Sequence, residues 1–279
     1  MKITIEMIKE LRQKTQAGIT NCKKALEETN GDIESAINFL KEKGLFYHKK
    51  NKTKDILEGL TNVVVKNNKA ILYELNAETD FVVQNKNFME LYNQLENILL
   101  EADSSIQNLK DFLKYQWNGQ SVEELISQKS FIIKEQIVLS RIQIIYKKDE
   151  EGFGFYKHQG GKISALVHLT KSSADVEEHI PVHIVGMKPK FLSKELIDIN
   201  FLNKEKEILL EQLKEKNSHK PLKDELLNKI VENKFNTLIE QNCLLEQPFY
   251  MESNQKVKEY LIQNKTDIIN YYYFEVGKK

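Results

Sequence analysis

Apolar residues recur at three- and four-residue steps through the first fifty positions, a pattern that predicts three short helices. Residues suited to capping a helix N-terminus stand at the start of the three runs: Thr4, Thr20 and Asp32. Residues that break or end helices follow the runs: Ala17-Gly18, Asn30-Gly31 and Gly44. Helices of about ten residues enclose only a thin core, so we expect residues 1–52 to form a small head that docks elsewhere.

After Gly59 the apolar period changes from helical to strand-like. Residues 60–65 and 70–75 flank Asn67-Asn68, and because asparagine tolerates positive φ, this pattern predicts a β-hairpin. Three more elements are expected in order: a helix at about 87–101, a helical stretch at about 122–130, and a strand at 142–146.

The order of hairpin and helix then repeats. Strands are expected at 153–157 and 163–169 around Gln159-Gly160-Gly161, followed by a helix from about Asp175 to Met187. A last strand is expected at 271–276. The repeated order predicts two similar α+β halves, which we place at residues 53–140 and 141–279.

Residues 201–239 have a different pattern of apolar residues, with leucines and isoleucines in two helical stripes on either side of a polar turn at Asn217–Pro221. This favours two antiparallel helices that protrude as a coiled-coil hairpin inserted at about 200–240. The alternative is two ordinary helices packed on the core. The expected fold class is therefore α+β, with a three-helix head and an inserted helical hairpin.

The composition narrows the function classes. Lys and Arg total 41 and Asp and Glu total 41. The net charge is therefore zero and provides no overall electrostatic attraction for direct binding of a nucleic acid. Cys22 and Cys243 stand far apart, which argues against a disulfide framework and a zinc site and favours a reducing compartment. The chain shows no signal-peptide core and no run of about 20 apolar residues that would favour a membrane helix. A cytoplasmic protein is expected.

Two patterns resemble catalytic motifs but fit them poorly. Gly160-Gly161-Lys162 lacks the upstream glycine and the following Ser or Thr of a phosphate loop, so a hairpin turn explains it better. His179 and His183 have the spacing of two metal ligands on a helix, but Ile180 follows His179 where a metalloprotease has glutamate, and no third ligand is apparent. We expect structural histidines, no catalytic residue, no metal, no cofactor and no bond-making chemistry.

One segment between a strand and a helix has two interpretations. It contains Thr79, Asp80, Phe81 and Val82. Pattern alone favours Phe81 turned into the local core, with Asp80 capping a turn. The alternative is an exposed aromatic anchor beside an acid, which is a common form of protein-interface hot spot.

Short motifs along nearly the whole chain occur in the order of one known family. They include Leu11-Arg12, Ala17-Gly18, residues 22–26 and 31–36, Glu78–Val82, Tyr156-Lys157-His158, residues 179–184, Lys188-Pro189, residues 247–251 and Phe274–Gly277. On these residues the chain resembles the elongation factor Ts family. Gln16 and Asn21 depart from the family's usual glycine and aspartate, which affects only the local loop.

The resemblance implies a ubiquitin-associated-type head and an exchange factor that releases GDP from the GTPase elongation factor Tu. It implies that Phe81, with Asp80 beside it, inserts near the GTPase's Mg²⁺ and displaces the ion, and that Thr79 and Val82 belong to the same contact. Lys23 in the head and His158 in the second half would make further contacts. The helical hairpin would either dimerise the protein or contact the GTPase.

Pro181 falls inside the helix expected from Asp175 to Met187, where proline removes one backbone hydrogen bond. We therefore expect a kink or a late helix start. Two rival functions remain at this point: a non-catalytic interaction scaffold that uses the head and the hairpin, and a metalloenzyme with its site at His179 and His183.

Overall fold

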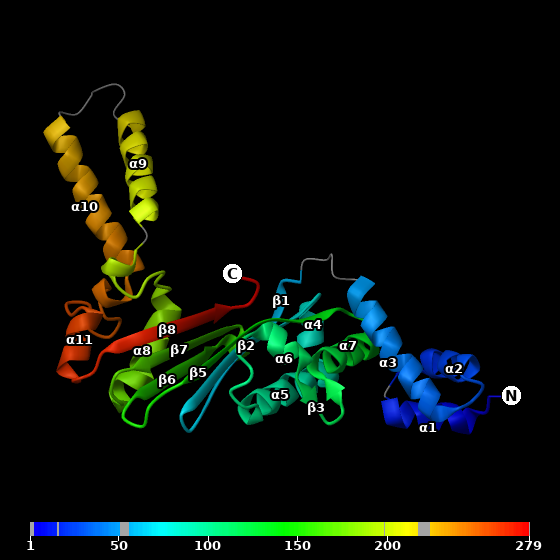
Figure 1. The fold of residues 1–279 in the computed structure, drawn as a ribbon. Coiled ribbons are helices and arrows are strands. Elements are labelled where there is room, and N and C mark those ends of the chain that lie inside the picture. The colour runs from blue at the N-terminus through cyan, green and yellow to red at the C-terminus, as the bar shows by residue number, and fades with distance from the viewer. Residues whose placement is uncertain (1–2, 16, 51–55, 198, 217–223, 279) are drawn as a thin grey trace. The chain divides into compact units, whose positions relative to one another are not determined.

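The computed structural model describes residues 3–15, 17–50, 56–197, 199–216 and 224–278. These residues form two compact units. The first comprises Met1–Tyr146, Lys157–Ser164 and Phe274–Lys279, and the second comprises Lys147–Tyr156 and Ala165–Tyr273. Small antiparallel sheets and helices follow three N-terminal helices, which confirms the α+β class (Figure 1).

The head consists of α1 (Ile5–Thr15), α2 (Ile19–Glu28) and α3 (Ile33–Lys50). Two of the expected caps are confirmed, because Thr4 Oγ1 accepts a hydrogen bond from the Met7 amide at 3.3 Å and Asp32 Oδ1 accepts one from the Ser35 amide at 2.7 Å. The Thr20 cap is wrong. Gly18 occupies the N-cap position with extended backbone, so α2 begins before Thr20.

The prediction that Gly44 ends the third helix is also wrong, because α3 continues through Gly44 to Lys50. A glycine inside a helix costs about 1 kcal/mol relative to alanine, which lowers stability without breaking the helix. Residues 51–55, the rest of the expected linker, lie outside the described residues.

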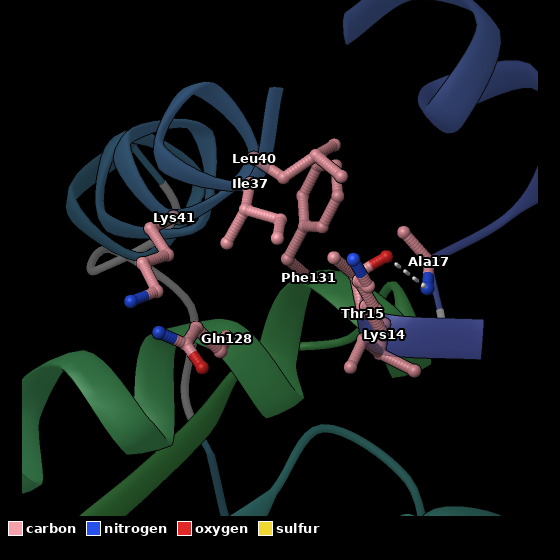
Figure 2. Close-up of a pocket in the computed structure, with 9 residues that line it drawn as sticks. Lys14, Thr15, Ala17, Ile37, Leu40, Lys41, Gln128 and Phe131 are labelled. Carbon is pink, nitrogen blue, oxygen red and sulfur yellow. Dashed lines mark hydrogen bonds between the residues drawn. The ribbon is translucent and has the colours of Figure 1, made fainter. Parts of the chain in front are cut away.

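The core of the head is small and receives a side chain from outside it. Its buried members are Leu11, Ala17, Cys22, Ala25, Leu26, Ala36 and Leu40. Phe131 of α7 (Val122–Ile133) packs against this core. Figure 2 shows the Phe131 ring pointing toward Ile37 and Leu40 of α3, beside a cavity of about 110 Å³. The head is therefore docked on α7, with Phe131 as an anchor.

The first sheet has the strand order β1-β2-β5. β1 (Glu58–Lys66) and β2 (Lys69–Ala77) form the expected hairpin, with Asn67 at φ 54° in the turn. β5 (Ile137–Tyr146) pairs with β2 in antiparallel fashion, ending with Ile137 opposite Ala77. α5 (Lys86–Glu101), the expected helix, and α7 cover this sheet and share one apolar core with it.

A short helix and a two-stranded hairpin in this unit were not predicted. α6 (Leu109–Lys114) is a short helix, and β3 (Gln116–Trp117) pairs with β4 (Gln120–Ser121) across Asn118-Gly119. Both turn residues have positive φ, which matches the strong hairpin preference of an Asn-Gly pair. The sequence signal was therefore present at this hairpin.

The second sheet has the order β6-β7-β8 and consists of β6 (Gly152–His158), β7 (Ile163–Leu169) and β8 (Ile268–Glu275). The β6–β7 connection is the short 3₁₀ turn η1 (Gln159–Gly161), so the interpretation of the Gly-Gly-Lys segment as a hairpin turn is confirmed. α8 (Ala174–Met187) begins before Pro181, so the late start is wrong, whereas a kink at Pro181 stays a prediction.

The second unit contains the two helices expected near residues 201–239. They are α9 (Ile199–Lys216) and α10 (Asp224–Asn242), which lie side by side (Figure 1). The turn expected at Asn217–Pro221 lies outside the described residues. The short turns η2 (Lys194–Leu196) and η3 (Leu244–Glu246) and the helix α11 (Val257–Gln263) complete this unit.

Candidate functional site

The segment after β2 forms a tight corner that presents an aromatic side chain to solvent. We define the Phe81 corner as residues 78–85, which contain the four-residue helix α4 (Asp80–Val83). The Phe81 side chain is 83% exposed, while Val82 is 4% exposed and belongs to the core beneath the first sheet. The prediction that Phe81 points inward is therefore wrong. Val82 occupies the core position instead, because a single helical turn offers few side chains to one face.

The prediction that Asp80 caps a turn is also wrong. Thr79 is the N-cap residue of α4, in extended conformation at φ −131° and ψ 156°, and Asp80 is the first helical residue. The Thr79 hydroxyl makes no hydrogen bond to the helix it precedes. It donates instead to the Glu135 carboxylate, at 2.9 Å from Oε2 and 3.2 Å from Oε1.

A second hydrogen bond runs between the same two segments. The Gln136 amide donates to Glu78 Oε1 at 3.1 Å. Glu135 and Gln136 reach this position because Lys134, the C-cap residue of α7, has left-handed backbone at φ 66° and turns the chain toward β5. The N-terminal side of the Phe81 corner is thus held by residues that follow α7.

The C-terminal side of the corner is held by the start of α5. The Asn85 amide donates to the Val82 carbonyl at 2.9 Å, and Asn85 Oδ1 caps α5 by accepting from the Asn87 amide at 2.8 Å. Lys129 of α7 then donates to Asn87 Oδ1 at 3.1 Å and to Glu90 at 2.8 Å. The hydrogen bond and charge of Lys129 lower the pKa of the Glu90 carboxyl. Both ends of the corner are therefore anchored.

His158 lies at the end of β6, immediately before η1. This turn is tied to β1, because Thr61 Oγ1 donates to the Gly161 carbonyl at 2.8 Å and Lys157 Nζ donates to Asn62 Oδ1 at 2.9 Å. α4 also packs against β1. The structure therefore places Phe81 and His158 on two elements that contact the same strand.

Lys23 lies on a third element, α2 of the head. Its side chain is 59% exposed, and Nζ is 3.7 Å from Glu27 one turn later. The candidate residues are thus distributed between the Phe81 corner, the η1 turn and the head, all within the first unit.

His179 and His183 pack a loop onto α8. His183 is buried; its Nε2 lies 3.0 Å from Gln247 Oε1, and its Nδ1 accepts from the Tyr250 amide at 3.3 Å. His179 Nδ1 lies 3.2 Å from the Tyr250 hydroxyl. Burial lowers the pKa of His183. Both ring nitrogens of His183 are engaged by protein groups, which confirms the structural interpretation of this residue.

No group of three or more His, Cys, Asp or Glu side chains in the described ranges is arranged to hold a metal ion. Among the helices that the structure describes, none has the length and apolar character needed to cross a membrane.

An exposed aromatic side chain on a rigid corner, within an α+β protein with a docked helical head, is typical of a protein-binding factor. Comparison with known proteins shows the family. A profile of the family described as Elongation factor TS matches residues 78–278. The chain belongs to the elongation factor Ts family, as the sequence motifs implied.

Relatives from several organisms match the chain along its length. Elongation factor Ts of Aster yellows witches'-broom phytoplasma (strain AYWB) is 44% identical over 99% of this chain and 100% of its own length. Elongation factor Ts of Phytoplasma mali (strain AT) is 43% identical over 100% of both chains. Elongation factor Ts of Acholeplasma laidlawii (strain PG-8A) is 39% identical over 100% of this chain and 94% of its own length.

Proposed function

We propose that this protein is a guanine-nucleotide exchange factor that binds the GTPase elongation factor Tu in its GDP-bound form and promotes GDP release. Family membership supports the partner and the exchange role. The 83% exposure of Phe81 on an anchored corner supports the mechanism, because such a side chain can bind a partner without rearrangement of this protein's core.

The mechanism proposed is displacement of the partner's metal ion. Mg²⁺ demands near-ideal octahedral geometry, and it bridges the phosphates of the bound nucleotide. A phenylalanine wedged near that site would shift the groups that position the ion, so the affinity for GDP would fall. Phe81 would be the wedge, with Thr79, Asp80 and Val82 forming its support and surroundings. Burying a phenylalanine in the partner contributes roughly 1.5–3 kcal/mol.

Thermodynamic linkage between nucleotide binding and exchange-factor binding determines how the exchange factor is released. If this protein weakens GDP binding by some factor, GDP weakens binding of this protein by the same factor. Rebinding of nucleotide, normally GTP, would therefore release the exchange factor. No covalent step, cofactor or general base takes part in this scheme, so the protein would act without bond-making chemistry.

Other assignments belong to the same proposal. Lys23 of the head and His158 beside η1 would contact the GTPase away from Phe81. The head in residues 1–52 would be of the ubiquitin-associated type, followed by subdomains at 53–140 and 141–279. The hairpin at about 200–240 would be a coiled coil that either dimerises the protein or contacts the GTPase. The proposed site of action is the cytoplasm.

The Phe81→Ala substitution tests the mechanism. Stopped-flow measurement of fluorescent GDP leaving elongation factor Tu should show stimulated release slowed about 10- to 100-fold, the factor that corresponds to losing the buried phenylalanine. Ile262→Ala is the matched control, since Ile262 is a 74% exposed apolar residue on α11 of the second unit. An unchanged rate for Phe81→Ala would remove Phe81 from the mechanism.

The same assay separates exchange from the scaffold alternative. A scaffold would bind elongation factor Tu without accelerating GDP release, and Phe81→Ala would leave that binding intact. Accelerated release by the unaltered protein, lost with Phe81, would exclude the scaffold.

A further inference from the structure

The support of the Phe81 corner comes from residues far away in the sequence. Thr79 and Glu135 are 56 positions apart, and the Thr79 hydroxyl donates to both oxygens of the Glu135 carboxylate. Phe81 is so exposed that this protein's own core does little to orient its ring. The direction of the side chain therefore depends on the backbone at the start of α4, where Thr79 is the N-cap residue.

The contact continues the register of the first sheet. Ala77 pairs with Ile137 at the end of the β2–β5 ladder. One step further, Glu78 accepts a hydrogen bond from the Gln136 amide, and one step beyond that Thr79 contacts Glu135. The same antiparallel offset relates all three pairs. Side-chain hydrogen bonds thus extend the ladder where backbone pairing ends, just before the chain turns into α4.

The Thr79 hydroxyl makes its hydrogen bond to Glu135 instead of capping its own helix. An N-cap threonine normally accepts a hydrogen bond from an amide in the first turn of its helix. Here that bond is absent, and the hydroxyl proton is directed to the Glu135 carboxylate. A hydrogen bond to an ionised acceptor is stronger than one between neutral groups. The segment is therefore held to the strand that follows α7, rather than to its own helix.

We infer that Glu135 is a positioning residue for Phe81. It acts through Thr79, fixing the backbone from which Phe81 projects, so that the ring is already oriented when the partner arrives. This inference rests on the proposed function, because it assigns to Glu135 a role in exchange rather than only in stability. Preorganisation of this kind increases affinity by lowering the entropy lost on binding.

Thr79→Val is the principal test, because valine keeps the shape of threonine and replaces only its hydroxyl with a methyl group. We expect kcat/KM for stimulated GDP release to fall about 3- to 10-fold, which corresponds to the net contribution of one typical intramolecular hydrogen bond. Thr79→Ser, which retains the hydroxyl, should stay within about twofold of the unaltered protein. Glu135→Ala should match Thr79→Val, and combining the two should add nothing further.

A purely structural role would give a different pattern. In the Phe81→Ala background, Thr79→Val should cause no additional loss of exchange, because the side chain that it orients is missing. Melting temperatures of all variants would show that each is folded at the assay temperature. If Thr79→Val slows exchange by the same factor with and without Phe81, the positioning role is overturned.

The two hypotheses can fail separately. Normal exchange by Phe81→Ala would overturn the proposed mechanism, and this inference with it. Slow exchange by Phe81→Ala together with normal exchange by Thr79→Val would overturn this inference alone. If Glu135→Ala does not fold, Thr79→Val and Thr79→Ser still test the same hydrogen bond from its other end.

Discussion

Phe81 and Phe249 each stand in a short turn beside another apolar residue, yet Phe81 is 83% exposed and Phe249 is 2% exposed. We define the Phe249 corner as residues 247–251, in the second unit. There the Phe249 ring stacks on Tyr260 of α11, with centroids 4.2 Å apart and planes 18° apart. Tyr250, the next residue, is 45% exposed and contacts His179.

The difference lies in which residue of each turn meets another element. In the Phe81 corner, Val82 enters the core and the phenylalanine is left outside. In the Phe249 corner, α11 supplies an aromatic face, so the phenylalanine turns inward and its neighbour is left outside. A phenylalanine in a turn is thus a core residue or a candidate contact residue according to what packs against it. Three predictions test this contrast.

The largest expected effect is on stability at the two phenylalanines. Phe249→Ala should lower the free energy of unfolding by about 3–5 kcal/mol, because it leaves a cavity against Tyr260. Phe81→Ala should change it by less than about 0.5 kcal/mol, because its side chain is already in water. Urea denaturation followed by far-ultraviolet circular dichroism measures both. Equal losses would mean that Phe81 is packed in solution, contrary to the structure.

A smaller effect is expected at the support of the Phe249 corner. α8 carries His179 and His183, and β6 approaches it closely at Gly154, where an added Cβ would lie 2.3 Å from the Glu177 carbonyl oxygen. Pro181, four residues after Glu177, has no amide proton, so the Glu177 carbonyl lacks the hydrogen bond that a helix normally provides. Gly154→Ala should therefore lower stability by about 1–3 kcal/mol through overpacking.

Gly186→Ala is the matched control. Gly186 lies in α8, the helix that Gly154 of β6 approaches, and an added Cβ at Gly186 meets nothing within 4 Å. That substitution should be neutral or stabilise by up to about 1 kcal/mol, because alanine favours the helix. Thermal melting of the two variants gives the comparison. A Gly154→Ala variant as stable as Gly186→Ala would show that β6 and α8 are not in close contact.

The smallest effect is a pH dependence confined to the Phe249 corner. Burial lowers the pKa of His183, so the folded state prefers the neutral ring, whose Nδ1 accepts from Tyr250. This contribution is complete above the unfolded-state pKa of about 6.5 and is lost as the pH falls toward the lower folded-state value. The slope in that window should be positive and at most about 1.4 kcal/mol per pH unit, the limit for one proton.

Chemical denaturation between about pH 7.5 and 5.5 measures this slope. His183→Gln should remove it, whereas His179→Gln should retain it, because the buried ring remains. The same slope in both variants would assign the pH dependence to other groups.

Local patterns predicted most of the regular structure. The β1–β2 hairpin, the helix α5 and the order of β6, β7 and α8 follow from apolar periods and turn residues, which act over a few neighbouring positions. The errors have local causes as well. Thr20 and Gly18 both suit an N-cap, and a glycine such as Gly44 weakens a helix without ending it. Asn118-Gly119 was a readable signal that was overlooked.

The candidate site likewise combines features that the sequence reveals with a contact that only the fold reveals. Its residue types and their order in the family motifs are readable along the chain, but Glu135 gave no local sign of its contact with Thr79. That contact depends on the pairing of β5 with β2, which joins segments separated by four helices and a second hairpin. No window of neighbouring residues contains both partners.

By itself, the sequence determined the α+β class, the helical head, the two hairpin-and-helix repeats and the family, because these depend on periodicity and on motifs within short segments. Only the tertiary structure decided that Val82 rather than Phe81 enters the core and that Glu135 holds Thr79. Burial is a relation between elements that are distant in the chain, so an apolar residue in a turn has no defined side until the neighbouring elements are in place.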